Sequence, residues 1–368
     1  MVSEDPIYEE LRKKIDESMP VGFPASEDGT ELRLLEMLFT PEEAKIAIHL
    51  SILPERLKVI HRRVKKAGIS ISINEMEERL DGLVEKGAIV GGAILDDEKQ
   101  GKRYSLTQWI FGMWELQVDK LTKEFAKLAE RYSLETFYQE LHQKDKPCQM
   151  RTIPLEKSLT PEHCVSTYDN IRELLENTVD SIVVINCICR QEHDLIEKSC
   201  KLSDIRRNCI AFNTFAEIAI KIVPSARRIS KDELLKILDT NQKEGFVIQT
   251  ENNQNPQYMC FCCGCCCGFL TTVKQFPHPA EYYSSNFYAQ SNPEICNGCK
   301  KCVERCQMEA ITMDDGKSSV NLDRCIGCGN CVAVCESNAM SLIKRDEEII
   351  PAKDQMELFQ NIMVKKIK

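Results

Sequence analysis

Residues 295–306 read ICNGCKKCVERC, and residues 324–335 read RCIGCGNCVAVC. Each stretch contains the spacing CxxCxxCxxxC, and the second copy follows the first at an offset of 29 residues. Glycine recurs inside both copies, at Gly298 and Gly327, where a tight loop favours a residue that adopts positive φ freely. This internal repeat predicts a small domain of two similar halves, each with a short strand, a loop and a short helix.

The cysteine spacing indicates iron–sulfur clusters. The short gaps let one loop place three thiolates around one cubane cluster, whereas the fourth cysteine lies in a helix and binds the other cluster. One predicted [4Fe–4S] site therefore comprises Cys296, Cys299, Cys302 and Cys335. The second comprises Cys325, Cys328, Cys331 and Cys306. A zinc knuckle would leave the third and fourth cysteines unused, and disulfides are disfavoured because no secretory leader is visible.

These motifs resemble the bacterial-type dicluster ferredoxin family over about Asn292 to Arg345. The resemblance implies a 2[4Fe–4S] domain, which we place at residues 291–346. The family usually has proline after the fourth cysteine, whereas this chain has Gln307 and Glu336. We expect this difference to loosen the turn and alter the shielding of the cluster without removing either site.

The composition is that of an ordinary protein with several domains. Of 368 residues, 43% are hydrophobic and 29% are charged, so an α+β, multidomain fold is expected. No run of 18 apolar residues is present, which predicts no membrane span. Free cysteines without a leader sequence predict a cytoplasmic location and an anaerobic host. The formal net charge of −9 argues against nucleic-acid binding by the chain as a whole.

The cysteine-free first part of the chain predicts a helical module. We divide it into an N-terminal tail at residues 1–29, a module at residues 30–108 and an amphipathic helical connector at residues 109–146. In the module, three helical patterns precede a hairpin, which is the order of a winged helix-turn-helix. Its third helix, near residues 74–87, is acidic, so DNA binding is disfavoured relative to protein docking or dimerisation. The connector reads as one long helix.

Residues 147–290 predict a cysteine-rich α/β middle domain. The strand 181–186 runs into Cys187 and Cys189, and a strand at 245–251 precedes the segment CFCCGCCC. Crowded thiolates repel each other unless a cation neutralises them, so a third metal centre is expected, iron–sulfur in preference to zinc. A redox-active thiol set is the alternative without metal. Candidate ligands are Cys187, Cys189, Cys200, Cys209, Cys260, Cys262, Cys263, Cys265, Cys266 and Cys267, whereas Cys148 and Cys164 read as ordinary thiols.

The chain also resembles, from about Glu31 onward, a group of anaerobic 4Fe–4S dicluster proteins. The matching pieces are LFTPEEA, GKRYSL ahead of FGMWE, CICR at 187–190, RRISKDELLKIL and CFCCGCCC. The group carries a winged-helix-like amino terminus, a CxCR segment and a CC-rich run. The resemblance implies iron–sulfur binding and electron transfer and leaves the partner open.

These patterns favour an electron carrier, or the electron-entry subunit of an oxidoreductase, that passes single electrons to a redox partner protein. No GxGxxG fingerprint and no P-loop is visible, so no nucleotide cofactor is predicted. A redox-responsive transcription regulator and a redox enzyme with an extra metal centre are the alternatives, and homo-oligomerisation stays open. No catalytic residue is predicted, and residues 347–368 read as an amphipathic tail.

Overall fold

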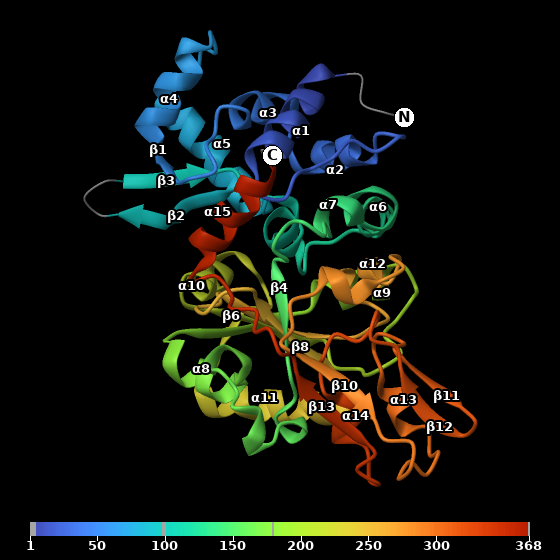
Figure 1. Ribbon diagram of the computed structural model, residues 1–368. Helices are drawn as coiled ribbons and strands as arrows, with labels where there is room; N and C mark the ends of the chain where they lie inside the picture. The colour runs from blue at the N-terminus through green and yellow to red at the C-terminus, as the bar shows by residue number, and fades with distance from the viewer. Residues whose placement is uncertain (1–4, 98–100, 179, 367–368) are drawn as a thin grey trace. The chain divides into compact units, whose positions relative to one another are not determined.

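The computed structural model describes residues 5–97, 101–178 and 180–366. Its chain contacts define two compact units, and each is described separately (Figure 1). Unit 1 contains Met1–Leu141, Asp194–Glu197 and Glu217–Ser225, and unit 2 contains His142–His193, Lys198–Ala216 and Ala226–Lys368. The first segment of unit 1 ends at Leu141, and the sequence placed a domain boundary near residue 146. The residues expected to form separate middle and ferredoxin domains share unit 2.

Unit 1 begins with a packed helix where the sequence suggested a tail. Asp5 caps α1 (Pro6–Ser18), and Tyr8, Leu11 and Ile15 are buried on one side of it. The helices that follow are α2 (Thr30–Leu38), α3 (Pro41–Ala47), α4 (Leu57–Lys66) and α5 (Ile73–Lys86). A three-stranded sheet of order β1-β3-β2 contains β1 (Glu55–Arg56), β2 (Val90–Asp97) and β3 (Gly101–Ser105).

The connector at 109–146 is not the single helix that its apolar spacing predicted. Non-helical backbone at Phe111 (φ 58°) and at Asp119 (φ 64°) interrupts the helical hydrogen bonds. A new helix, α6 (Lys123–Tyr132), then starts at its cap Thr122, and α7 (Tyr138–Leu141) follows. The apolar side chains still share one core, in which Trp109 packs on Phe23, Trp114, Phe125 and Tyr132. Separate short segments therefore satisfy a pattern that resembles one long helix.

Unit 2 is built on a six-stranded sheet of order β4-β8-β9-β6-β5-β7. Its strands are β4 (Met150–Ile153), β5 (Ile182–Asn186), β6 (Arg207–Phe212), β7 (Arg227–Arg228), β8 (Val247–Glu251) and β9 (Tyr258–Cys262). Every pair of neighbouring strands in it is antiparallel. The middle part is therefore α+β and not the α/β domain that the sequence predicted. An α/β domain needs parallel strands joined by crossover connections, and this sheet contains only antiparallel pairs.

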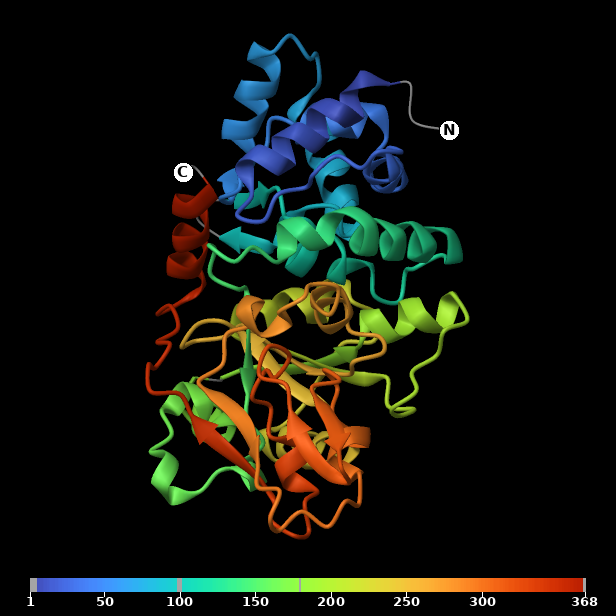
Figure 2. The ribbon, with the colours of Figure 1, turned by 45° about the vertical axis from the view of Figure 1, so that its right-hand side comes forward.

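The two faces of this sheet are covered by different helices (Figures 1 and 2). On one face, α8 (Ile171–Thr178) and α11 (Lys231–Glu244) pack their leucines against the sheet. The sheet residues of this core are Ile153, Ile182, Val184, Ile210, Phe212, Ile248, Met259 and Phe261. Because side chains alternate along a strand, Cys209, Cys260 and Cys262 belong to the other face. The start of α9 (Ile188–Leu195) and α12 (Gly268–Val273) lie on that side.

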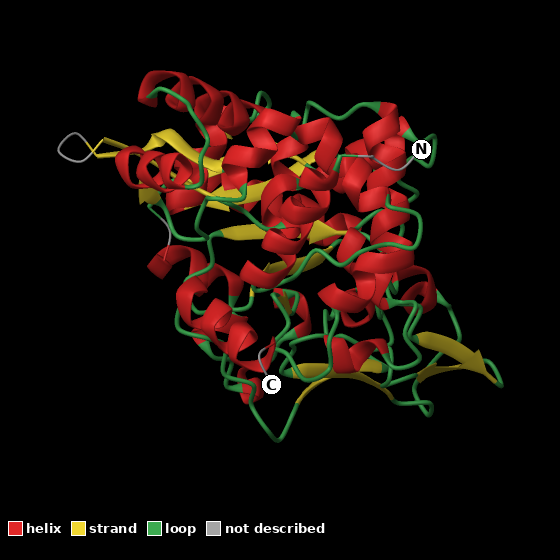
Figure 3. Cartoon of the chain, turned by 90° about the horizontal axis from the view of Figure 1, so that it is seen from above, coloured by secondary structure: helices red, strands yellow, loops and turns green. Residues whose placement is uncertain are grey.

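The C-terminal part of unit 2 has the repeat that the sequence indicated. Its elements are β10 (Phe287–Ser291), α13 (Lys301–Arg305), β11 (Ile311–Asp314), β12 (Lys317–Val320), α14 (Asn330–Ala333) and β13 (Met340–Lys344). Strand β10 pairs with β13 and β11 with β12, and the β11–β12 hairpin lies at an edge of the unit (Figures 1 and 3). The first strand starts at Phe287, before the expected limit at residue 291.

The tail ends in α15 (Gln355–Lys366), whose Leu358 and Ile362 are buried. Gln355 donates to Glu251 of β8 at 2.7 Å. In the part of the chain that the structure describes, no helix combines the length and the apolar character needed to cross a lipid bilayer.

Candidate metal centres

The eight cysteines of the repeat line two separate cavities. One cavity, with an empty volume of about 290 Å³, is lined by Cys296, Cys299, Cys302 and Cys335. The other, of about 360 Å³, is lined by Cys306, Cys325, Cys328 and Cys331. These are the two sets of four expected from the spacing, with the last cysteine of each motif in the cavity of the other motif. Four thiols around an open space fit a cubane cluster, which needs one thiolate for each iron.

Backbone N–H groups point at the sulfur atoms in a symmetric pattern. The N–H of Ala289 donates to Sγ of Cys325 at 3.3 Å, and that of Ser318, 29 residues later, donates to Sγ of Cys296 at 3.4 Å. A second pair of such bonds runs from Ala310 to Cys306 at 3.2 Å and from Met340 to Cys335 at 3.4 Å. N–H donors stabilise negative sulfur, so the backbone is arranged for thiolates and their clusters.

The ligand-loop glycines have little space around them. Gly298 and Gly327 have φ of 73° and 68°. A Cβ on Gly327 would lie 2.1 Å from the carbonyl oxygen of Phe287, and one on Gly298 would lie 2.6 Å from that of Gly316. Both the positive φ and the close backbone therefore require glycine here.

Burial works against unligated thiolates in the second cavity. Loss of solvent raises the pKa of Cys328 to about 12 and also raises the pKa of Cys306 and Cys331. By contrast, hydrogen bonds from the hydroxyl and N–H of Ser318 lower the pKa of Cys296 to about 7. Buried thiolates need a nearby cation, and the irons of a cluster supply that positive charge.

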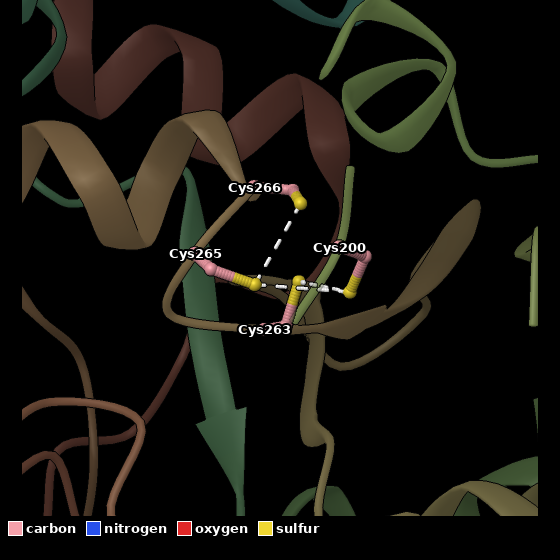
Figure 4. A group of neighbouring side chains, drawn as sticks. All are labelled: Cys200, Cys263, Cys265 and Cys266. Atoms are coloured by element: carbon pink, nitrogen blue, oxygen red, sulfur yellow. Dashed lines mark hydrogen bonds between the residues drawn. The ribbon is translucent and has the colours of Figure 1, made fainter. Parts of the chain in front are cut away.

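Four cysteines of the middle part form a compact group, Cys200, Cys263, Cys265 and Cys266 (Figure 4). Their sulfur atoms all lie within 4.8 Å of one another. Cys200 contacts Cys263 and Cys265 at 3.7 Å, and Cys265 contacts Cys266 at 3.7 Å. Hydrogen bonds from the Cys263 and Cys266 thiols lower the pKa of Cys265 to about 3. We call this group the four-thiol site.

The sulfur spacing of the four-thiol site suits one metal ion. Tetrahedral coordination with metal–sulfur bonds of about 2.3 Å separates the sulfur atoms by roughly 3.8 Å. Three of the six sulfur pairs, at 3.7 Å, match that separation, and all six pairs lie within 4.8 Å. A cubane would place irons and sulfides between the thiolates and keep them apart. The geometry therefore favours a single ion over the iron–sulfur cluster that the sequence led us to prefer.

The four-thiol site is joined directly to the ferredoxin part. The N–H of Gly264 donates to Oε1 of Gln307 at 2.8 Å, and a Cβ on Gly264 would lie 2.1 Å from the carbonyl oxygen of Gln307. Lys274 donates to the carbonyl oxygen of Gly264 at 3.0 Å and pairs with Glu309 at 2.7 Å. Glutamine in place of the usual proline thus provides a contact that proline could not make.

The other six candidate cysteines form a second group. They are Cys187, Cys189, Cys209, Cys260, Cys262 and Cys267, and none of them belongs to the four-thiol site. Cys148 and Cys164 lie in neither group, and burial raises the pKa of Cys148 to about 11. The sequence named all ten ligand candidates but could not divide them.

Arg190, which the sequence comparison included only as part of CICR and to which it gave no role, is only 1% exposed. Its guanidinium donates to Asn208 and, at 3.0 Å, to the carbonyl oxygen of Phe261, and it covers the ring of Phe246 at 4.3 Å. Burial lowers its pKa, but Cys187, Cys263 and Cys200 outweigh burial and raise it. The position of an arginine directly after the CxC pair was the available signal.

Residues 295–340 match the family model of the 4Fe-4S dicluster domain, a span that contains all eight cysteines of the two cavities. No curated protein matches the chain. The chain is therefore an iron–sulfur protein by its C-terminal part.

Proposed function

We propose that this chain is an electron-transfer protein that exchanges single electrons with a separate redox protein. The pair of four-cysteine cavities, within a segment that matches a 4Fe-4S dicluster domain, carries the proposal. Clusters bound there supply one-electron chemistry, with potentials set by hydrogen bonds to sulfur, by burial and by charge. The eight cysteines named above are the proposed ligands.

The surface around Cys299 is the proposed docking place for the redox partner. Cys299 is exposed, whereas Cys325 and Cys331 of the other cavity are buried. Lys300, next to Cys299, is exposed and also lines its cavity, whereas Lys301 pairs with Glu336. Acidic and basic residues balance between Asn292 and Arg345, so the local charge of Lys300, and not an overall charge, would orient a partner.

We propose a third metal at the four-thiol site, a single iron. Gly264 lies between two of its cysteines, and Gln307 follows Cys306 of the second cavity. One hydrogen bond therefore connects the two proposed metal-binding loops. Such a direct connection would let electrons pass between the two sites, which favours a redox-active ion over zinc, because zinc has no redox chemistry. The chain's contribution is to hold the two loops together through Gln307 and Lys274.

For unit 1 we propose a winged-helix-like module that docks protein in preference to DNA. The order α3, β1, α4, α5, β2, β3 and the single small sheet support the fold. In the hairpin, Lys102 pairs with Glu77 at 2.8 Å and with Asp81 at 2.6 Å, both on α5. Because acidic side chains of the third helix pair with this wing lysine, its attraction to DNA phosphates is weak.

Electron exchange with a one-electron acceptor tests the proposed function. The anaerobically purified full chain, reduced chemically and mixed with an oxidised viologen of higher potential, is expected to deliver about two electrons from the ferredoxin part. A Cys299→Ser/Cys328→Ser double variant, altered in both cavities, is expected to lose both of these electrons. A wild-type chain that carries about eight irons but delivers none of these electrons would contradict the proposal.

A further inference from the structure

Three cysteines lie together on the sheet face opposite the α8–α11 core. Cys209 of β6 is directly opposite Cys260 of β9, and residues opposite each other in an antiparallel pair point to the same face. Cys262 is two residues beyond Cys260 and therefore points to that face as well. Strand alternation alone thus places these three thiols side by side.

Three more thiols close the group into a ring. The pKa of Cys187, at the end of β5, is shifted by Cys189 and Cys209, and that of Cys209 by Cys187 and Cys260. Cys260 and Cys262, Cys262 and Cys267, and Cys267 and Cys189 shift each other's pKa in the same way. Each of the six thiols therefore has two others near enough to change its pKa, and we call this group the six-thiol ring.

The six-thiol ring is separate from the four-thiol site. Cys263 and Cys266 belong to the hydrophobic core on the α8–α11 side, against which Cys200 and Cys265 also pack. Cys262 and Cys263, adjacent in sequence, thus direct their thiols into different groups.

The ring also has the features of a site for negative sulfur. Besides the neighbouring thiols, the backbone N–H groups of Arg190 and Leu270 lower the pKa of Cys187 and Cys267. Cys187, Cys262 and Cys267 are buried, and the other three are partly buried.

The buried positive charge of Arg190 also favours negatively charged sulfur at both cysteine groups. Burial lowers the pKa of the guanidinium, and Cys187 of the ring together with Cys263 and Cys200 of the four-thiol site raises it. Within the residues described, none of the groups that shift this pKa most is a carboxylate, and Nε of Arg190 has no hydrogen-bond partner. A buried cation without a counter-charge is strongly unfavourable. Thiolates at both sites would provide that charge, and crowded thiolates in turn need metal ions.

We propose that the six-thiol ring binds a polynuclear cluster of soft metal ions, separate from the metal of the four-thiol site. A single tetrahedral ion uses only four thiolates. Two tetrahedral ions that share two bridging thiolates use all six. The ring therefore suits at least two ions, either bridged by the cysteines alone or joined by inorganic sulfide.

Metal analysis of the anaerobically purified full chain tests this proposal, with every element counted per chain. Cys209→Ser is expected to lose at least two metal ions of the wild-type total, whereas Cys266→Ser loses a different ion and keeps those of the ring. Cys164→Ser, which changes an exposed cysteine outside all sites, serves as the matched control. The electron paramagnetic resonance (EPR) signals of the ferredoxin part should persist in all three variants.

If a variant fails to fold, the metal content of the wild-type chain still tests the proposal. With about eight irons for the ferredoxin part and one ion for the four-thiol site, a ring cluster raises the total to about eleven or more. A wild-type total of about nine, or a Cys209→Ser variant with undiminished metal, would overturn the proposal. Neither result would affect the proposed function, which depends on the ferredoxin clusters.

Discussion

Serine at position 306 is expected to remove the cluster of the second motif, although Cys306 belongs to the first. Cys306 lines the cavity of Cys325, Cys328 and Cys331, so Cys306→Ser and Cys328→Ser should alter the same EPR signal. Each variant should lose up to about four irons, because serine is a poor substitute for a thiolate in such a cluster. Cys299→Ser should alter the other signal.

Double variants test more strictly which four cysteines bind each cluster. Cys306→Ser/Cys328→Ser is expected to lose no more iron than the more severe single variant, because both changes affect one site. Cys306→Ser/Cys299→Ser is expected to lose up to about eight irons. The assignment fails if Cys306→Ser instead abolishes the signal that Cys299→Ser abolishes. Exposed Cys164, changed to serine, provides the baseline for iron content.

Methionine in place of Arg190 is expected to weaken metal retention at the six-thiol ring and the four-thiol site together. The change keeps a long apolar stem but removes the buried charge that lies beside both groups. Loss of a group that supports metal ligands lowers metal affinity about 10- to 100-fold. Competition with a chelator under anaerobic conditions, followed by metal analysis, measures the effect.

Comparison with lysine separates charge from packing at this position. Arg190→Lys retains the positive charge but loses the contacts to Asn208 and Phe261, so it should retain more metal than Arg190→Met. Arg227→Met removes an exposed arginine and should behave as wild type. Equal metal loss in the lysine and methionine variants would show that Arg190 acts by packing alone.

The local chemistry of the sequence was more informative than its long-range arrangement. The spacing of the eight ferredoxin cysteines predicted which four share a cavity, because the loop and helix geometry is repeated within a few residues. Strands at 181–186 and 245–251 were likewise predicted, and the structure has strands at Ile182–Asn186 and Val247–Glu251. Their antiparallel order was not predicted, because the pairing of distant strands depends on the whole unit.

The division of the middle cysteines also required the fold. Residues 260–267 give the order of the thiols along the chain, but only the sheet shows that Cys262 and Cys263 join different groups. The role of Gln307 could not be read from the motif either, since its partner Gly264 is 43 residues away. The breaks in the connector were hidden because short segments with one shared core retain helical spacing.

The most direct test of the central claim is EPR spectroscopy, with iron and sulfide analysis, of the anaerobically purified chain during stepwise reduction. Two clusters held by the eight ferredoxin cysteines predict about eight irons with matching acid-labile sulfide in that part, and two one-electron signals that appear on reduction. Cys306→Ser and Cys299→Ser would each alter one of them. Reduction that produces no iron–sulfur signal, or a metal content made up of zinc without sulfide, would contradict the account.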